Sequence, residues 1–217
     1  MQASTTERLR STLVEGMAAL DLPPCADQVD KLLNFLDLMT RWNRVYNLTA
    51  VRTPEQMVAR HLLDSLALVP FVQGETVLDV GSGAGLPAIP VAIARPDVEV
   101  TALDSNGKKT RFITQAKSQL GLENVKVEHT RVEQFAPSHL YSTLTSRAFS
   151  SLAEFDGLCR RLCRDDGEIV AMLGRVPQQA EIDAVGDRLI EIRQVAVPGV
   201  DGERHIARIR PVKPSRP

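Results

Sequence analysis

Three glycines at alternate positions, Gly81, Gly83 and Gly85, follow an acidic residue, Asp79, that lies at the end of an apolar run. The apolar segment Ala88–Ala94 comes shortly after them. This order predicts a strand, a tight turn and a helix, because glycine serves where the backbone bends sharply or approaches a ligand closely. The start of such a helix presents unpaired N–H groups. The stretch is therefore typical of a turn that holds a nucleotide-like cofactor.

The spacing of the acid and the glycines distinguishes two classes of cofactor. Dinucleotide sites use Gly-x-Gly-x-x-Gly and seat a pyrophosphate on the helix N-terminus. Here the pattern is Asp79-x-Gly81-x-Gly83-x-Gly85, and its carboxylate would repel a pyrophosphate but tolerate a cofactor with a cationic or amino group. The stretch resembles the S-adenosylmethionine-binding loop of Rossmann-like methyltransferases. A glycine turn without any ligand is the alternative interpretation.

Further candidate residues follow the next predicted strands, at the sheet edge where open α/β sheets bind their ligands. Asp104 can accept hydrogen bonds from both ribose hydroxyls, and a solvated loop carboxylate is the alternative. Val132 and Glu133 could flank an adenine with their backbone groups, although a surface loop fits the sequence equally well. Arg147 could bind a cofactor carboxylate, an RNA phosphate or a structural acid. The residues alone favour the structural ion pair.

His61, Asp64 and Ser65 have the side-chain types of a hydrolytic triad and share one face of a predicted helix. Triad members normally converge from separate elements and need an oxyanion hole. Neighbours on a single helix do not meet that requirement. We expect them instead to fix the helices onto the sheet or to line a substrate cleft.

The elements that must position these residues divide the chain into two parts. Residues 1–70 predict a helical unit, with helices over 5–20, Asp27–Trp42 and Pro54–Val69, the last one capped by Thr53. Residues 71–217 alternate strands and helices, which predicts a doubly wound, mostly parallel α/β sheet. The predicted strands are Thr76–Val80, Val98–Leu103, Val125–His129, Ser142–Ser146, Glu168–Met172, Arg193–Val197 and His205–Ile209. The predicted helices between them are Leu86–Ala94, Gly107–Leu120, Leu152–Cys163 and Gln178–Leu189.

The last two predicted strands are joined by Pro198–Gly202. This link is too short for a crossover connection, so it predicts an antiparallel hairpin at one edge of the sheet.

The composition limits the classes of protein to consider. A chain of 217 residues with 43% hydrophobic and 24% charged residues can bury the core of one large domain. A net charge of −1 gives no global attraction to nucleic acid, so any RNA contact needs local basic patches. Three cysteines predict a reduced, cytoplasmic protein without a disulfide framework, and no metal site is expected. We expect no membrane span and a monomer.

Several segments of the chain together carry a family resemblance. They are Trp42–Thr49, Arg60–Ser65, Leu78–Pro87, Arg131–Glu133, Ser146–Phe149 and Asp201–His205. In this order they closely resemble the bacterial small-subunit ribosomal RNA methyltransferase G family, also called glucose-inhibited division protein B. The resemblance covers about residues 32–209. Its most specific parts are the Asn-Leu-Thr and His-x-x-Asp-Ser segments.

The resemblance implies a Rossmann-like class I methyltransferase with a seven-stranded sheet and an N-terminal helical extension. Such an enzyme transfers a methyl group from S-adenosylmethionine to N7 of a guanine in 16S ribosomal RNA. Because N7 carries a lone pair and no proton, we expect no general base and name no catalytic residue. The expected cofactor-binding residues are Gly81, Gly83, Leu86, Asp104, Val132, Glu133 and Arg147.

One departure from the family pattern concerns the substrate. Leu173 stands where the family usually has lysine, and Arg175 is the nearest basic residue that could replace its charge. The implied partner is ribosomal RNA, either naked or in an assembling small subunit. Methylation of another substrate, or a non-catalytic role as an RNA-binding assembly factor, are the alternatives. Candidate contacts for RNA phosphate are Arg44, Arg52, Arg60, Lys108, Lys109, Arg204 and Arg208.

Overall fold

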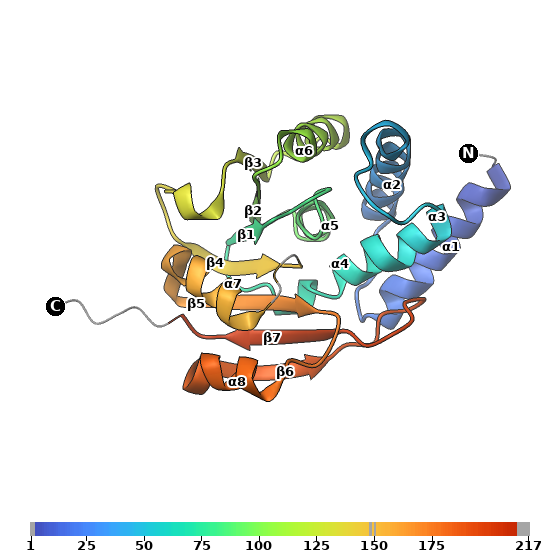
Figure 1. Cartoon of the computed structure of the whole chain (residues 1–217). Helices are drawn as coiled ribbons and strands as arrows, with labels where there is room; N and C mark the ends of the chain where they lie inside the picture. Colours follow the sequence, from blue (N-terminus) through green and yellow to red (C-terminus); the bar gives the residue numbers. More distant parts are fainter. Residues whose placement is uncertain (1–2, 148, 150, 212–217) are drawn as a thin grey trace.

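The protein, described by a computed structural model over residues 3–147, 149 and 151–211, is a single twisted sheet with helices on both faces (Figure 1). The strands are β1 (Thr76–Val80), β2 (Glu99–Asp104), β3 (Val125–His129), β4 (Tyr141–Ser146), β5 (Cys163–Leu173), β6 (Leu189–Gln194) and β7 (His205–Ile209). Their order across the sheet is β3-β2-β1-β4-β5-β7-β6. The first five strands in this order, β3, β2, β1, β4 and β5, are parallel to one another. Strand β7 is antiparallel to both β5 and β6. The predicted α/β sheet with an antiparallel edge hairpin is confirmed.

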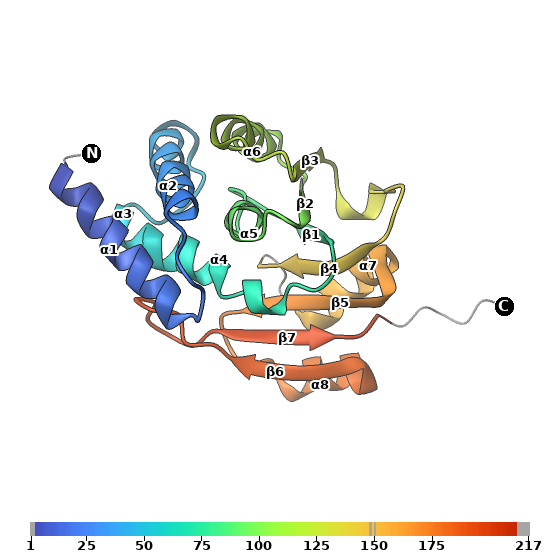
Figure 2. The same ribbon diagram turned by 180° about the vertical axis from the view of Figure 1, so that it is seen from behind.

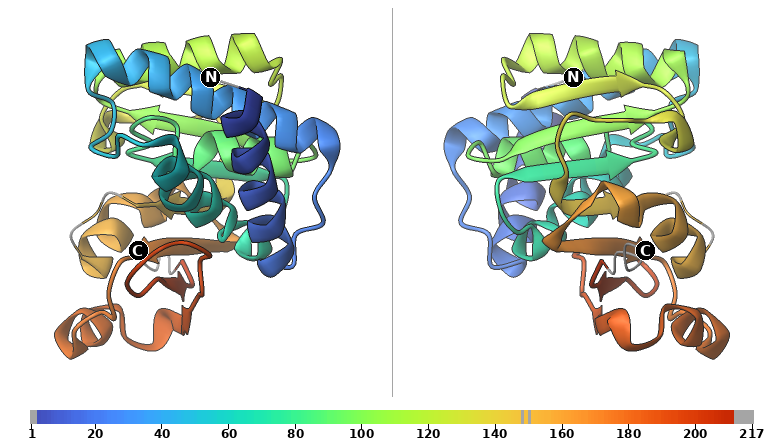
Figure 3. Two further views of the ribbon diagram at one scale, coloured as in Figure 1. Left: turned by 90° about the vertical axis from the view of Figure 1, so that its right-hand side faces the viewer. Right: turned by 90° about the vertical axis from the view of Figure 1, so that its left-hand side faces the viewer.

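The helices form two layers of unequal size (Figures 1 and 3). They are α1 (Ala3–Ala19), α2 (Ala26–Tyr46), α3 (Pro54–Met57), α4 (Asp64–Leu66), α5 (Ala88–Ala94), α6 (Gly107–Leu120), α7 (Leu152–Cys159) and α8 (Gln179–Val185). One face of the sheet carries α5 and α6, with the helices of the N-terminal region packed outside them (Figure 2). The opposite face carries α7 and α8.

Two buried clusters correspond to the two faces of the sheet. Val77 belongs to the larger cluster and its neighbour Leu78 to the smaller one, because successive side chains of a strand point to opposite faces. Leu13 of α1 and Leu36 of α2 lie in the larger cluster together with strand residues. Burial of each such leucine contributes about 1.5–3 kcal/mol. The N-terminal helices are therefore held on the sheet by a shared apolar core.

Local signals set the ends of α6, which coincide with the prediction. The side chain of Asn106 accepts a hydrogen bond from the Lys108 N–H at 3.0 Å, which satisfies one of the free donors at the helix start. Gly121 ends the helix in a left-handed conformation. Asn106 also follows β2 closely, so this cap fixes the connection beside the sheet edge.

The predicted helix over Pro54–Val69 begins where expected, but it is not one regular α-helix. It consists of α3, a π-helical segment at Val58–Leu63, and α4, followed by a 3-10 turn at Val69–Phe71. Helical periodicity in sequence does not distinguish i→i+4 from i→i+5 hydrogen bonds. Short π-helical stretches recur at functional sites, and this one carries His61.

The predicted position of the sixth strand is also wrong. The strand was expected at Arg193–Val197, but β6 spans Leu189–Gln194. Helix α8 ends at Val185, and Gly186 follows with a positive φ of 60°. The chain then pairs with β7, with Gln194 opposite His205. Pairing with β7 thus sets the position of this strand, and the predicted helix over Gln178–Leu189 is shorter than expected.

A pair of glycine substitutions tests the close packing of the glycine loop. Gly85 and Gly121 both have positive φ, but only a Cβ at Gly85 would meet a neighbour, Ile89 Cγ1 at 2.8 Å. We expect Gly121→Ala to lower the free energy of unfolding by about 1–2 kcal/mol through backbone strain alone. Gly85→Ala should lower it by about 1–3 kcal/mol more because of overpacking. Chemical denaturation measures both, and equal losses would contradict the packing account.

Candidate active site

The glycine loop after β1 is tied to the end of β2. The N–H groups of Gly81 and Ser82 donate to the Leu103 carbonyl oxygen at 2.8 and 3.0 Å. Gly81, Gly83 and Gly85 all have positive φ, between 57° and 76°, a conformation that glycine adopts without strain. The loop is thus a fixed turn whose backbone lies at the carboxyl edge of the sheet.

Asp104, the last residue of β2, connects this loop to the start of α6. Its Oδ2 accepts a hydrogen bond from the Gly83 N–H at 2.8 Å, and its Oδ1 accepts one from the Asn106 N–H at 2.8 Å. The residue is only 7% exposed. Each carboxylate oxygen can accept a further hydrogen bond. Asp104 is therefore oriented and still able to bind ligand hydroxyls.

A cavity of about 450 Å³ opens beside these residues, within the size range of small-molecule sites. It is lined at the ends of β1 and β2 and by the segment after β3. Gly81, Asp104, Val132 and Glu133, four of the seven predicted cofactor residues, line it. Its charged lining residues are three acids and two bases, namely Asp104, Glu133, Glu154, Lys109 and Arg131. The cavity therefore favours a ligand with cationic or amino groups. We refer to it as the acidic cavity.

Gly83 and Leu86 do not line the acidic cavity. Gly83 donates its N–H to Asp104, and Leu86 is 5% exposed within the larger buried cluster. Both residues therefore stabilise the loop without lining the acidic cavity. Phe149, Glu154 and Leu158 do line the cavity, and sequence reasoning missed Glu154 and Leu158. They come from the α7 region, which the chain order gives no reason to place beside β2.

Asp79, the acid of the predicted motif, does not line the acidic cavity. The residue is fully buried, and its Oδ2 accepts the Ala88 N–H at the start of α5 at 3.2 Å. Its Oδ1 has no hydrogen-bond partner among the described residues. Burial raises the pKa of the Asp79 carboxyl to about 7. Asp79 acts on the loop conformation rather than on a ligand.

Arg147 lies away from the acidic cavity, in an ion pair with Asp64. Its Nη1 is 2.8 Å from Asp64 Oδ2, and Arg204 Nε is 2.8 Å from Asp64 Oδ1. Asp64 is 6% exposed. The structural pair that the residues alone favoured for Arg147 is thus present. The neighbouring Ala148 of the resemblance segment lies outside the described residues.

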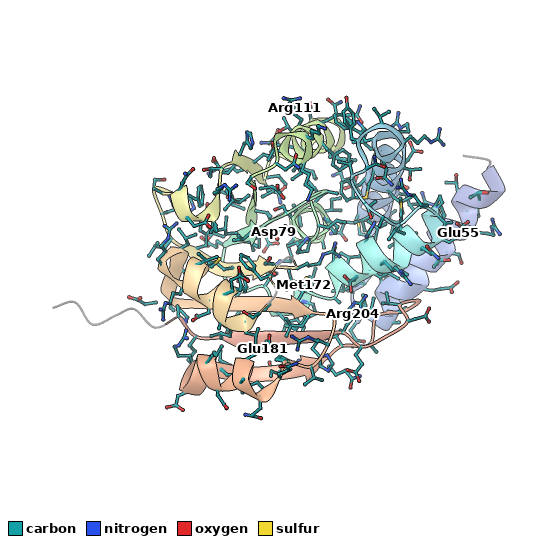
Figure 4. All side chains as sticks on the ribbon, viewed as in Figure 1. Glu55, Asp79, Arg111, Met172, Glu181 and Arg204 are labelled. Atoms are coloured by element: carbon teal, nitrogen blue, oxygen red, sulfur yellow. The ribbon has the colours of Figure 1, made fainter. Side chains whose placement is uncertain are left out.

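Asp64 and its two arginines line a second cavity of about 360 Å³. Arg60 lines it as well, so three bases face one acid. We refer to it as the basic cavity. Met172 and Arg204 reach it from β5 and from the link between β6 and β7 (Figure 4).

His61 also lines the basic cavity and is held by the Asn-Leu-Thr segment. Its Nε2 lies 2.8 Å from Thr49 Oγ1, and the Thr49 N–H donates to Asn43 Oδ1 at 2.9 Å. Burial, together with the nearby Arg147 charge, lowers the pKa of His61 to about 4. The ring is therefore neutral near pH 7. Ser65 is fully buried and does not line the cavity, which agrees with the rejection of a hydrolytic triad.

A smaller hollow of about 120 Å³ lies between the two cavities. It shares Phe149 with the acidic cavity, and Arg147 and Leu173 with the basic cavity. Arg175 lines it too, but its Nη1 pairs with Glu181 Oε2 at 2.8 Å. The three hollows thus lie next to one another at the carboxyl edge of the sheet, and we refer to them together as the groove. Arg147 stands between its ends.

The part of the chain that is described contains neither a cluster of metal ligands nor a candidate membrane-spanning helix. Within residues 3–147, 149 and 151–211, no three His, Cys, Asp or Glu side chains gather as metal ligands would. In the same residues, no helix has both the length and the apolar character that a membrane crossing requires.

Comparison with known sequences identifies close relatives of this chain. The sequence profile of the family described as rRNA small subunit methyltransferase G matches residues 28–207. The Ribosomal RNA small subunit methyltransferase G of Chromobacterium violaceum is 50% identical over 199 residues, which cover 91% of this chain and 95% of that protein. A protein of the same name from Nitrosococcus oceani is 43% identical over 201 residues, covering 92% and 94%.

Solved structures show the same fold at low sequence identity. A SAM dependent methyltransferase from Aquifex aeolicus matches with a TM-score of 0.56 at 18% identity, over 76% of this chain and 97% of that chain. Precorrin-6y C5,15-methyltransferase from Geobacter metallireducens matches with a TM-score of 0.55 at 17% identity, over 76% and 91%.

The buried carboxyl of Asp79 predicts a pH dependence of stability. Between pH 3.8 and about 7, the folded state keeps a proton that the unfolded state has released. The contribution of Asp79 to the free energy of unfolding therefore falls as the pH rises through this window. Asp79→Asn removes this titration, so the stability of the variant relative to the wild type should rise between about pH 4 and about pH 7 and then stay constant. Urea denaturation at each pH measures the difference, and a constant difference would contradict the account.

Proposed function

Because the chain belongs to the rRNA small subunit methyltransferase G family, we propose that it methylates N7 of one guanine in small-subunit ribosomal RNA. The family and the fold make it an S-adenosylmethionine-dependent methyltransferase. The observation that carries the proposal is the groove at the carboxyl edge of the sheet, where a smaller hollow shares Phe149 with the acidic cavity and Arg147 with the basic cavity.

The acidic cavity fits the cofactor in size and charge. S-adenosylmethionine supplies, when bound, an electrophilic methyl carbon on a positively charged sulfur. Asp104 would accept hydrogen bonds from the ribose hydroxyls. Val132 and Glu133 would flank the adenine, and the Gly81 backbone would lie against the ligand. Three acids against two bases in the lining suit the cofactor's cationic groups.

We keep Gly83, Leu86 and Arg147 in the proposed cofactor site, with different roles. Gly83 holds Asp104 through its N–H, and Leu86 anchors the loop in the core. Arg147 uses Nη1 for Asp64 and for the Arg60 carbonyl oxygen. A guanidinium carries five N–H donors, so Arg147 can also reach a carboxylate in the hollow that it lines.

Methyl transfer to guanine N7 requires the protein to position the two reactants, not to transfer a proton. Guanine N7 has a lone pair and no proton in the neutral base, so no general base is required. Holding two reactants in line removes most of the entropic barrier of their encounter. The groove performs this role by placing the two ligands in adjoining cavities.

Three finer points complete the proposal. We propose that the enzyme works in the cytoplasm, because its family acts on ribosomal RNA, and that it works as a monomer. The substrate is ribosomal RNA, either naked or in an assembling subunit. The division of the chain near residue 70 stays a prediction.

A nucleoside profile tests the reaction. We expect small-subunit ribosomal RNA from cells lacking this protein to lack one 7-methylguanosine, and the purified protein to restore it with methyl-labelled S-adenosylmethionine. Mass spectrometry of digested RNA measures the product. RNA binding without any methyl product would instead favour a non-catalytic assembly factor. Label on a protein or small molecule would favour another substrate.

Two acids beside β2 provide a matched test of the cofactor site. Asp104 ends the strand in the acidic cavity, whereas Asp97 precedes it and pairs with Arg95 on the surface. Asp104→Asn should weaken S-adenosylmethionine binding about 10- to 100-fold, the size expected for losing a charged hydrogen bond. Asp97→Asn should leave the affinity unchanged. Isothermal titration calorimetry measures both dissociation constants, and an unaltered constant for Asp104→Asn would exclude the ribose role.

A further inference from the structure

We propose that the outer surface of helix α6, together with Tyr46 beside it, binds a second part of the substrate RNA, outside the groove. Helix α6 lies between α2 and β3, and Arg111 lies on its outer side (Figures 1 and 4). The inference rests on the proposed function, because it takes RNA to be the substrate. We refer to this region as the α6 surface, which consists of Trp42, Tyr46, Lys108, Arg111, Gln115 and His129.

The α6 surface is hollowed, and its hollow is separate from the groove. A cavity of about 380 Å³ is lined by Trp42 of α2, by Arg111 and Gln115 of α6, and by Val127 and His129 of β3. This cavity shares no lining residue with the acidic cavity, the basic cavity or the hollow between them. Binding of the cofactor and of the target guanine in the groove therefore does not account for it.

The charge of the α6 surface favours a polyanion. Helix α6 contains three lysines and one arginine and no acid. Lys108 and Arg111 are exposed and lie three residues apart, which places them on one side of the helix. Among the described residues, neither takes part in an ion pair, whereas the exposed Lys126 of β3 pairs with Glu99 at 2.8 Å. Free cations of this kind contact RNA phosphates.

Aromatic rings beside these cations supply a face for a base. Four rings follow one another from the core to the surface, with 5.9 Å between the centroids of Phe35 and Phe112, 5.5 Å between Phe112 and Trp42, and 5.0 Å between Trp42 and Tyr46. Phe35 and Phe112 are fully buried, whereas Tyr46 is 46% exposed. Packing in the core does not account for the open part of the Tyr46 ring. A ring that is backed by other rings is a stiff stacking platform for an unpaired base.

The combination of rings and cations distinguishes RNA from other polyanions. An acidic protein would use the cations alone, whereas single-stranded RNA uses phosphates and bases together. The position also fits a longer RNA that enters the groove. His129 Nε2 lies 3.2 Å from the Ser105 carbonyl oxygen, and Ser105 lines the acidic cavity. The α6 surface therefore begins at the rim of the groove, so one RNA strand can contact both.

The fluorescence of the wild-type protein tests binding without turnover. Trp42, which is the only tryptophan of the chain, lines the cavity of the α6 surface. An oligoadenylate of about 12 nucleotides, added with saturating S-adenosylhomocysteine, should quench Trp42 in a saturable manner, and added salt should weaken its binding. Poly-L-glutamate, which is anionic but has no bases, should not quench it. Absence of quenching by the oligoadenylate, or equal quenching by poly-L-glutamate, would overturn the proposal.

Substitution of Tyr46 tests the stacking. Tyr46→Ala should raise KM for small-subunit ribosomal RNA about 5- to 100-fold, the loss expected for one stacked base. The turnover number kcat and the dissociation constant of S-adenosylmethionine should stay within about twofold, because Tyr46 does not line the groove. Tyr46→Phe keeps the ring and should keep KM. An unchanged KM for Tyr46→Ala, or an equal rise for Tyr46→Phe, contradicts the role of the ring.

Substitution of Arg111 tests the phosphate contact, and Arg160 provides the matched control. Arg160 is also exposed and without an ion pair among the described residues, but it follows α7 on the opposite face of the sheet. Arg111→Gln should lower the slope of the logarithm of the RNA binding constant against the logarithm of the salt concentration by about 1. Arg160→Gln should leave the slope unchanged. Equal slopes for the two variants would show a general charge effect and sink the assignment.

These measurements distinguish failure of the inference from failure of the proposed function. If the wild type forms no 7-methylguanosine, the proposed function fails, whereas the fluorescence titration still tests RNA binding at the α6 surface by itself. If the wild type methylates RNA and the Tyr46→Ala and Arg111→Gln variants do so with the same KM, only the inference fails.

Discussion

A carboxylate that is buried in its charged form must be paired, and the basic cavity depends on this constraint. Removing one partner from a buried ion pair leaves an uncompensated charge at high cost. Asp64 meets the requirement with Arg147 and Arg204, which come from the end of β4 and the link before β7. The N-terminal helical region and the sheet edge are thereby held in one arrangement. The shape of the basic cavity follows from that arrangement.

Two acids at the same edge of the sheet have different roles. Asp79 and Asp104 both lie at the ends of neighbouring parallel strands. Asp79 turns inward, caps the backbone at Ala88 and has a pKa raised by burial. Asp104 turns toward the acidic cavity and holds the glycine loop through Gly83. One acid therefore stabilises the turn, and the other faces the ligand.

The contacts in the N-terminal helical region explain what the Asn-Leu-Thr and His-x-x-Asp-Ser segments do in the structure. Asn43 and Thr49 hold the backbone and His61 in a short hydrogen-bonded chain. The π-helical segment then leads directly into Asp64. None of these residues lines the acidic cavity. His61 and Asp64, which they hold in place, line the basic cavity instead.

The sequence by itself determined the α/β fold class with its antiparallel edge hairpin, and the positions of the glycine loop and of Asp104 at strand ends, because strand periodicity and turn chemistry are local properties. It also indicated the family, because several short segments match the sequence motifs of that family. Only the tertiary structure decided where Arg147 points, that Glu154 and Leu158 reach the acidic cavity, and that β6 begins at Leu189. The reason is that ion pairs, cavity walls and edge-strand registers join residues far apart in the chain. A local sequence pattern does not identify partners that are distant in the chain.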